Sequence, residues 1–314
     1  MATSEPTASA GTPHAGKTKL DGFSIAVMLA LTLAWGGNNV AIKIANSGLQ
    51  PVFQSGFRLV LGSLLILIWC AFRRVRLFER DGTFAVGILV GTIFGVEFLL
   101  LYLGLDFTTA ARGVVFFFSM PFFVAIGAHF MLPNERMTRE HVIGLCVAFI
   151  GMVLAFSDKL SLPSPDALIG DVLCLIAGML WAADTLIMKK SRLNQIAPEK
   201  SLLYHVVTGA ILIMAAAPFF GPFIRDLNGL VIAAFAFQVI IVVGVTYGVW
   251  MWMIKHYPAA RLASFAFLSP VYGVLLGALL LDEPVGVQLI SALVLVAAGI
   301  FLVNRPRRDL VAPI

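Results

Sequence analysis

The chain has 314 residues with a formal net charge of +5; 60% of the residues are hydrophobic and 12% are charged. An ordinary soluble domain carries about 25% charged residues, so these few charges cannot cover the surface of a soluble protein of this length. The composition and the mean hydropathy of +0.95 exclude a soluble enzyme, a disordered chain and a secreted disulfide scaffold, and they indicate an integral membrane protein whose partner is the lipid bilayer.

Residues 1–22 form a polar tail that we expect to be disordered and cytoplasmic. Within it, Gly11–Thr18 fits the G-x-x-x-x-G-K-T pattern of a phosphate-binding loop. A working loop of this kind needs a strand before it and a helix after it in a soluble sheet, and the tail supplies neither. We therefore predict no nucleotide and no other cofactor. The net positive charge belongs to short basic loops, so we expect no nucleic-acid partner.

Ten apolar stretches of helix length follow the tail. A hydrocarbon core about 30 Å thick needs about 20 helical residues at a rise of 1.5 Å per residue, and these stretches approach that length. The predicted spans are 23–45, 52–72, 83–103, 110–132, 139–156, 167–189, 200–221, 229–254, 260–281 and 285–303. Residues 304–314 form a second tail. The sequence therefore predicts an all-α membrane protein with ten transmembrane helices.

The distribution of Lys and Arg predicts the orientation of these spans. With the N-terminus in the cytoplasm, all but five of the 22 Lys and Arg residues lie on the cytoplasmic side. The exceptions are Lys43, Arg58, Arg112, Lys159 and Arg225. Because cytoplasmic loops are enriched in these residues, we expect a multi-pass protein of the inner membrane with both termini in the cytoplasm.

The second half of the chain repeats the first at an offset of about 146–149 residues. Trp35 in the first span recurs as Trp181 in the sixth. Further pairs in register are Lys43 and Lys189, Gly62 and Gly209, Ala111–Arg112 and Ala260–Arg261, Pro121 and Pro270, Glu135 and Glu283, and Gly151 and Gly299. Five spans per repeat is an odd number, so the second repeat (157–303) must be inverted relative to the first (23–156). Inverted repeats supply the two conformations of alternating access.

Two motifs resemble a known family. Residues 33–39 read Leu-Ala-Trp-Gly-Gly-Asn-Asn, and residues 269–284 read S-P-V-Y-G-V-L-L-G-A-L-L-L-D-E-P. They resemble the EamA-type transporters of the drug/metabolite transporter superfamily, most closely the YddG-type aromatic amino-acid exporters, over residues 23–303. The resemblance implies ten helices in two inverted five-helix repeats, and export of small metabolites, often amino acids.

Polar and ionisable residues inside the spans are candidates for substrate contact. A charged residue at the centre of a span costs about 2.5–3.5 kcal/mol on insertion scales, so its presence suggests a function. The candidates are Asn38, Asn39, Arg58, Glu97, Asp184 and His205. The helical rise places the first four in the outer half of the membrane and the last two nearer the inner side. For an amino-acid substrate, Glu97 would take the ammonium group and Arg58 the carboxylate.

Each candidate also has a structural interpretation. Arg58 could extend to the outer interface, and Glu97 could pair with Arg58 or Arg112 as a structural lock. Asp184 could relay protons, as could Glu97, or it could meet water or a lysine near the helix end. His205 could be structural, and the amides could form hydrogen bonds between helices.

Aromatic residues and prolines complete the candidates. The residues proposed for an aromatic cavity wall are Trp35, Trp181, Tyr247 and Trp250. Such a wall would suit aromatic or large apolar substrates, although Trp and Tyr also favour membrane interfaces. Pro121 and Pro270 fall in the middle of equivalent spans, where each acts as a hinge or as a fixed kink.

These features together predict a secondary transporter or facilitator that exports amino acids, with aromatic and other apolar ones favoured. The alternative is an exporter of the same fold for drugs or for other metabolites, such as nucleotide sugars, polyamines or purines. A more remote alternative is a membrane enzyme or subunit without transport activity. We predict no enzyme, because the sequence has neither H-E-x-x-H nor G-x-S-x-G. Two repeats in one chain can complete a pathway in a monomer.

Overall fold

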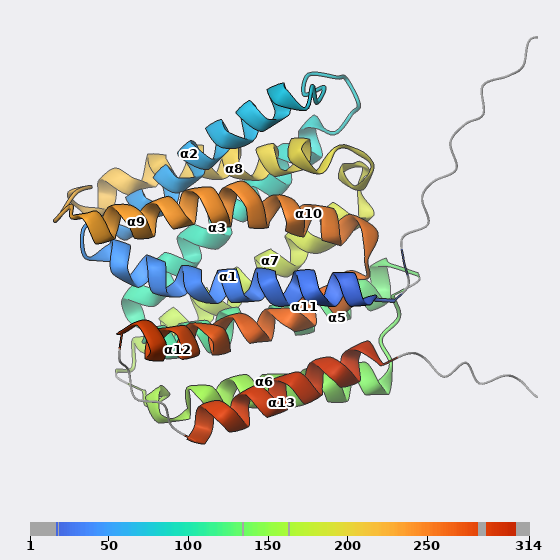
Figure 1. Ribbon diagram of the computed structural model, residues 1–314, viewed down its shortest axis with the longest axis vertical. Coiled ribbons are helices and arrows are strands. Elements are labelled where there is room, and N and C mark those ends of the chain that lie inside the picture. The colour runs from blue at the N-terminus through green and yellow to red at the C-terminus, as the bar shows by residue number, and fades with distance from the viewer. Residues whose placement is uncertain (1–16, 18, 134, 163, 282–286, 306–314) are drawn as a thin grey trace, which may run out of the picture.

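A computed structural model describes residues 17, 19–133, 135–162, 164–281 and 287–305 (Figure 1). The first half contains α1 (Gly22–Asn46), α2 (Pro51–Phe72), α3 (Phe84–Phe107), α4 (Ala110–Phe117), α5 (Met120–Met131) and α6 (Arg139–Ala155). The second half contains α7 (Ala167–Lys190), α8 (Pro198–Ala216), α9 (Gly229–Phe237), a π-helix (Gln238–Thr246), α10 (Tyr247–His256), α11 (Ala259–Ser264), α12 (Leu268–Leu281) and α13 (Val287–Asn304). Short 3-10 turns cover Ser157–Lys159, Arg192–Gln195, Ala217–Phe220 and Phe265–Phe267. The Gly11–Thr18 pattern lies outside the described residues except for Lys17.

These helices confirm the all-α membrane fold and follow the predicted spans. Eight stretches of the described chain are long and apolar enough to cross a membrane. The last helix, α13, is apolar but shorter, and α6 has 17 residues. Three of the predicted spans contain more than one α-helix: 110–132, 229–254 and 260–281.

Polar caps mark where several helices begin. Asp21 precedes α1, and its Oδ1 accepts a hydrogen bond of 2.8 Å from the backbone N–H of Ser24. Thr138 caps α6 in the same manner, and Pro51 occupies the first turn of α2. Such residues satisfy or avoid the unpaired N–H groups of a helix start. The turns between spans are therefore defined by local chemistry as well as by the end of the apolar runs.

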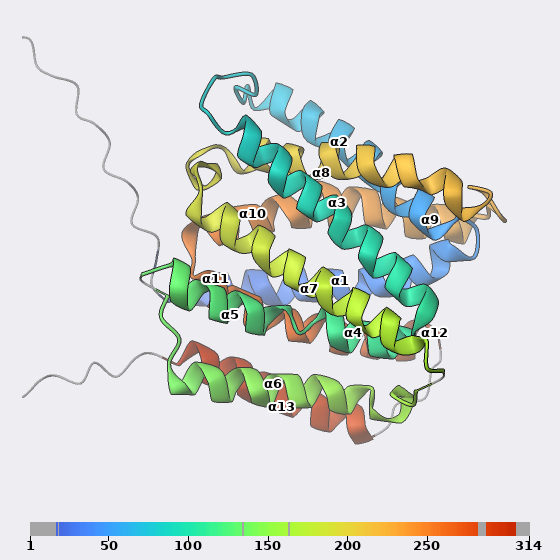
Figure 2. The same cartoon turned by 180° about the vertical axis from the view of Figure 1, so that it is seen from behind.

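Helix contacts of one half recur in the other. α3 packs against α7 and α8, and its counterpart, the segment from α9 to α10, packs against α1 and α2. α4 and α5 pack against α7, as α12 packs against α1. The pairs α2–α8 and α6–α13 join equivalent helices, and Figures 1 and 2 show α6 and α13 together at one edge of the bundle. Because each half has five segments that reverse in turn, equivalent helices run in opposite directions.

The start of α1 and the end of α13 lie at the same end of the bundle, which we call the terminal end (Figure 1). This follows from an even number of crossings. Close helix contacts hold the bundle together, as at Gly91 on α3. A Cβ atom there would lie 2.2 Å from the carbonyl oxygen of Tyr204 on α8, so only glycine permits this approach.

Both candidate hinge prolines lie directly after a helix break. α4 ends at Phe117, and Pro121 occupies the first turn of α5. In the second half, α11 passes through the 3-10 turn Phe265–Phe267, and Pro270 is the third residue of α12. Equivalent spans are thus interrupted at equivalent places. Motion at these breaks stays a prediction.

Candidate functional site

A cavity of about 580 Å³ lies between the two halves of the bundle. On α1 its lining residues run from Trp35, in the middle of the helix, to Asn46 at its last residue. Among the described residues of α1, none before Trp35 lines it. The cavity therefore extends from the middle of the bundle to the end opposite the terminal end, where Lys43 and Ala110 are exposed. We call this the open end.

All but one of the candidate side chains line this cavity. They are Trp35, Asn38, Asn39, Arg58, Glu97, Trp181, Asp184, Tyr247 and Trp250. The exception, His205, lies behind Asp184 and is hydrogen-bonded to it. Pro270 also lines the cavity, whereas Pro121 is not among its lining residues. The structure brings candidates from both halves into one space, and their contact with a substrate stays a prediction.

Packed indole and phenyl rings form the deep end of the cavity. The Trp35 ring centroid lies 5.4 Å from that of Trp250 and 6.2 Å from that of Trp181, both edge to face. Phe117 stacks on Trp181 at 5.2 Å. Trp35 Nε1 also donates a 3.0 Å hydrogen bond to Oγ1 of Thr246, the last residue of the π-helix. These contacts hold Trp35 in one orientation and give the cavity an aromatic floor.

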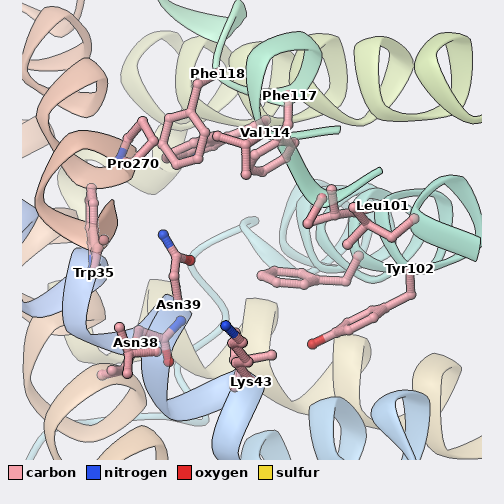
Figure 3. A pocket seen from close by; sticks show the side chains of 18 of the residues that line it. Trp35, Asn38, Asn39, Lys43, Leu101, Tyr102, Val114, Phe117, Phe118 and Pro270 are labelled. Atoms are coloured by element: carbon pink, nitrogen blue, oxygen red, sulfur yellow. The ribbon is translucent and has the colours of Figure 1, made fainter. Parts of the chain in front are cut away.

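Amide and amino groups of α1 face the same space. Figure 3 shows Asn39 and Lys43 projecting from α1 toward the opening that Phe117 and Phe118 face from the other side. Asn39 and Lys43 follow Trp35 at intervals of four residues, so one face of α1 carries all three. The Oδ1 of Asn38 is buried without a hydrogen-bond partner. This face therefore adds polar groups to an otherwise apolar wall.

Arg58 is held inside the protein and does not extend to the interface. Arg58 is only 1% exposed, and its guanidinium carbon lies 5.2 Å from the centre of the Phe98 ring. Its Nη1 donates a hydrogen bond of 3.4 Å to Oε1 of Gln238, while its Nε has no hydrogen-bond partner. The interpretation as a residue that reaches the interface is therefore wrong. A buried guanidinium group with an unpaired N–H can donate hydrogen bonds to an anionic group.

Glu97 is buried without a cation of its own. It is 3% exposed, and its Oε2 has no hydrogen-bond partner. Within the described chain, no ion pair joins Glu97 to Arg58 or Arg112. Arg112 pairs with Asp171 on α7 instead, through both its Nε and its Nη2. The structural lock proposed for Glu97 is therefore wrong, and Arg58 and Glu97 line the same cavity without an ion pair between them among the described contacts.

Asp184 and His205 form a buried hydrogen-bonded pair. His205 Nε2 lies 2.8 Å from Asp184 Oδ1, and its Nδ1 lies 2.8 Å from the carbonyl oxygen of Ser201. Helical rise had placed Asp184 at a different depth from Glu97, yet both line one continuous cavity. The pair is therefore part of the same site.

Charged and polar side chains form a cluster at the terminal end of the bundle, outside the cavity lining. We call Lys17, Asp21, Glu135, Lys189 and Tyr257 the closing cluster. Lys17 Nζ lies 2.5 Å from Asp21 Oδ2 and 3.1 Å from the hydroxyl of Tyr257. The hydrogen bond from Lys17 holds the pKa of the Asp21 carboxyl well below its usual range. Because this pKa is lowered, Asp21 stays ionised to lower pH than an ordinary aspartate, and its contact with Lys17 persists over the same range.

The rest of the closing cluster is centred on Lys189. Its Nζ donates hydrogen bonds to the carbonyl oxygens of Ile254, at 2.6 Å, and of Tyr257. Glu135 lies 3.7 Å from the same amino group and accepts a hydrogen bond from the backbone N–H of Ala260. Burial raises the pKa of the Glu135 carboxyl. These contacts join α7 to the loop before α6 and to the turn between α10 and α11.

Gln238 and Thr246, the polar ends of the π-helix, were not among the candidates predicted from the sequence. Gln238 accepts hydrogen bonds from Arg58 and Gln54, and its amide donates to the carbonyl oxygen of Ala41. An amide within the apolar span 229–254 was a signal that could have identified it, by the same insertion-cost argument as for the other candidates. Rare π-helical turns occur frequently at functional sites.

Comparison with known proteins places this architecture in a family. The model of the EamA-like transporter family matches twice, at residues 22–157 and 168–305. The chain is 24% identical to an uncharacterized transporter, YoaV, of Bacillus subtilis, over 88% of this chain and 94% of the relative. It is 26% identical to a probable amino-acid metabolite efflux pump of Salmonella typhimurium, over 91% of this chain and 95% of the relative.

A solved crystal structure has the same fold, with a TM-score of 0.79 over 90% of this chain and 96% of that chain at 17% sequence identity. The double match of the family model agrees with the paired helix contacts of the two halves. On these grounds the chain is a membrane transporter that belongs to the EamA-like transporter family.

Proposed function

We propose that this transporter exports amino acids, with aromatic and other apolar ones favoured, as a secondary transporter or facilitator. The Salmonella relative described as a probable amino-acid metabolite efflux pump supports the amino-acid class. The proposal rests mainly on one observation: Arg58 and Glu97 line one cavity, and neither is neutralised by the other.

The two charges match the two charged groups of an amino acid. A guanidinium group binds carboxylates with directed hydrogen bonds, and a carboxylate binds an ammonium group. The buried Nε of Arg58 and Oε2 of Glu97 have no hydrogen-bond partner among the described residues, and a buried polar group left unpaired costs about 1–3 kcal/mol. A zwitterion that pairs with both would recover that cost. A substrate with a single charge would leave one of them unpaired.

The aromatic floor supports the preference for apolar side chains. Trp35, Trp181 and Trp250 present ring faces and edges that suit an aromatic or large aliphatic group. The cavity volume of about 580 Å³ lies within the range of small-molecule sites. An amino acid with its charged end at Arg58 and Glu97 would direct its side chain toward these rings.

The mechanism that we propose is alternating access of the two inverted halves. The cavity reaches the open end, and the closing cluster holds the terminal end together, as in one of the two states of such a cycle. The excess of Lys and Arg at the terminal end supports a cytoplasmic location for that end, and we propose an inner-membrane protein with both termini in the cytoplasm. One chain builds the whole cavity, which supports transport by a monomer.

The test is uptake into proteoliposomes with a substrate gradient alone. The labelled panel contains Phe, Trp, Met, Thr, Lys, Glu and one cationic drug. We expect saturable entry of Phe and Met that the other apolar amino acids inhibit, and little entry of Lys or Glu. Protein-free liposomes provide the control. Entry of the drug alone, or of nucleotide sugars, polyamines or purines but no amino acid, would favour the alternative substrates.

A further inference from the structure

The buried pair of Asp184 and His205 must hold a proton between its two side chains. The carbonyl oxygen of Ser201 only accepts hydrogen bonds, so the 2.8 Å contact requires a hydrogen on Nδ1 of His205. The 2.8 Å contact between Nε2 and the Asp184 carboxyl oxygen requires a second hydrogen, on either atom. The pair therefore carries one proton more than an ionised aspartate beside a neutral histidine. Its net charge is zero in this conformation.

This proton has a route to water through the cavity. His205 is 0% exposed, whereas Asp184 lines the cavity and is 4% exposed. Asp184 follows Trp181 by three residues on α7, so both lie on the cavity side of that helix. The phenyl ring of Phe94 covers His205 edge-on, with centroids 5.7 Å apart. The proton therefore enters and leaves on the Asp184 side of the pair.

Other charges around the cavity determine what loss of the proton does. The titratable and charged groups that line it are Lys43 of α1, Arg58 of α2, Glu97 and Tyr102 of α3, Asp184 of α7 and Tyr247 of α10. Arg112 of α4 is paired with Asp171. Loss of the proton leaves one negative charge on the pair, in the cavity that also contains Glu97. A negative charge on the pair favours a bound ammonium group more than a neutral pair does.

We propose that Asp184 and His205 form a proton-binding site whose occupancy competes with the ammonium group of the substrate, so that transport is coupled to protons. The coupling rests on the proposed function, but the proton site does not. Competition couples the two ligands. Release of the proton strengthens substrate binding, and substrate binding promotes release of the proton by the same factor. A carrier that returns with a proton after releasing an amino acid operates as an antiporter.

The experiment compares two assays of purified protein in proteoliposomes, with Phe as the probe. Counterflow measures exchange of labelled for unlabelled Phe at equal pH, and accumulation measures concentration of Phe under an imposed pH gradient. We expect the wild type to perform both. We expect the ratio of accumulation to counterflow to fall about tenfold or more in His205→Gln, because an amide does not titrate. In the wild type, the apparent affinity for Phe should fall by up to about tenfold per pH unit on acidification, the limit for one competing proton.

The matched control is His256→Gln. His256 makes the same local contact as His205, from Nδ1 to the carbonyl oxygen four residues earlier, at 2.7 Å. It is stacked on Trp252 and has no hydrogen bond to a carboxylate among the described contacts. We expect His256→Gln to retain both counterflow and pH-driven accumulation of Phe. Accumulation that survives in His205→Gln would overturn the proton site. Counterflow without pH-driven accumulation in the wild type would overturn the coupling and leave the proposed function standing.

A third measurement requires no substrate and no transport. Infrared difference spectra of the purified protein between about pH 5 and 8 report proton binding to imidazole and carboxyl groups. We expect one protonation event to be absent from His205→Gln and from Asp184→Asn but present in His256→Gln. If no compound of the panel is transported, this measurement still tests whether Asp184 and His205 bind a proton. Identical spectra of wild type and His205→Gln would overturn it, and where His205→Gln does not fold, Asp184→Asn provides the comparison.

Discussion

Lys189 Nζ lies 3.7 Å from Glu135 Oε1, and both side chains form hydrogen bonds with the backbone of the same turn of the second half. Lys189 donates to the carbonyl oxygens of Ile254 and Tyr257, and Glu135 accepts from the N–H of Ala260. The turn between α10 and α11 is thereby tied to α7 and to the loop before α6. This arrangement lies on the terminal-end side of Trp181, and none of these residues lines the cavity.

Lys189→Met should shift the protein away from the state with the open cavity. Removing one partner of a buried ion pair is strongly destabilising, and a loss of about 1–2 kcal/mol changes the equilibrium between states by roughly five- to thirtyfold. The measurement is maleimide labelling of Val114→Cys, a cavity position on α4, in a protein that lacks Cys70, Cys146 and Cys174. We expect slower labelling from the open end.

The control for this prediction is Lys190→Met, since Lys190 is the exposed neighbour of Lys189. It removes the same charge without touching the ion pair with Glu135. Labelling of Val114→Cys should then proceed at the original rate. Equal rates in the Lys189 and Lys190 variants would show that the closing cluster does not determine the conformation.

Gly36→Ala should destabilise the protein, whereas Gly37→Ala should not. A Cβ atom at Gly36 would lie 2.6 Å from the Cβ of Tyr272 and 2.9 Å from the backbone nitrogen of Gly273, so α1 and α12 would have to separate. A Cβ atom at Gly37 would meet nothing closer than 3.6 Å, at Leu276. Overpacking costs about 1–3 kcal/mol, and alanine in an unhindered helix position gains about 0.5–1 kcal/mol over glycine. The measurement is thermal unfolding in detergent. A lower midpoint for Gly37→Ala than for Gly36→Ala would contradict the helix contact.

Trp35→Phe and Thr246→Val should show non-additive effects on stability. Each removes one side of the 3.0 Å hydrogen bond that joins α1 to the π-helix. We expect the double variant to be less destabilised than the sum of the single ones by about 0.5–1.5 kcal/mol, the value of one buried hydrogen bond. The free energy of unfolding in a denaturing detergent provides the measurement. The remote change Thr83→Val should be additive with Trp35→Phe, and additivity in the first pair would mean that the hydrogen bond contributes nothing.

The sequence predicted the helices well because apolar run length is a direct property of a span. The structure places α1 at Gly22–Asn46 where 23–45 was predicted, and α7 at Ala167–Lys190 where 167–189 was predicted. Repeat matches likewise identified Trp35 and Trp181, whose rings meet in the cavity. Equivalent residues of an inverted repeat lie at mirrored depths, so a recurring residue in the middle of its span, such as Trp35, meets its counterpart near the middle of the bundle.

The sequence did not predict which side chains pair between helices. Arg112 was considered as a partner of Glu97, but it reaches Asp171, because α4 packs on α7. Asp184 was considered beside a lysine near the helix end, but it meets His205. Hydropathy gives the depth of a residue and not the direction of its helix face toward a neighbour. The π-helix was missed for a related reason: one extra residue per turn leaves the apolar composition unchanged.

Gln238→Leu should weaken binding of substrates that carry a carboxylate. Gln238 orients Arg58 through the hydrogen bond from Nη1, and it also joins α1 through the carbonyl oxygen of Ala41. Without Gln238, the guanidinium of Arg58 loses its only hydrogen-bond acceptor among the described contacts. Its orientation is then no longer held. Leaving such a buried group unpaired costs about 1–3 kcal/mol, so we expect the KM for Phe to rise about tenfold with little change in the maximal rate. Phenethylamine lacks the carboxylate. Its inhibition constant against Phe transport should therefore be the same for the wild type and the variant.

The matched control is Gln288→Leu, the same exchange at an exposed position of α13 outside the cavity lining. It should leave the KM for Phe unchanged. If Gln238→Leu instead lowered the maximal rate and left the KM unchanged, then Gln238 would act on the movement of the π-helix between states and not on Arg58. An equal loss for Phe and phenethylamine would point to the same conclusion, because only an effect through the carboxylate separates these two compounds.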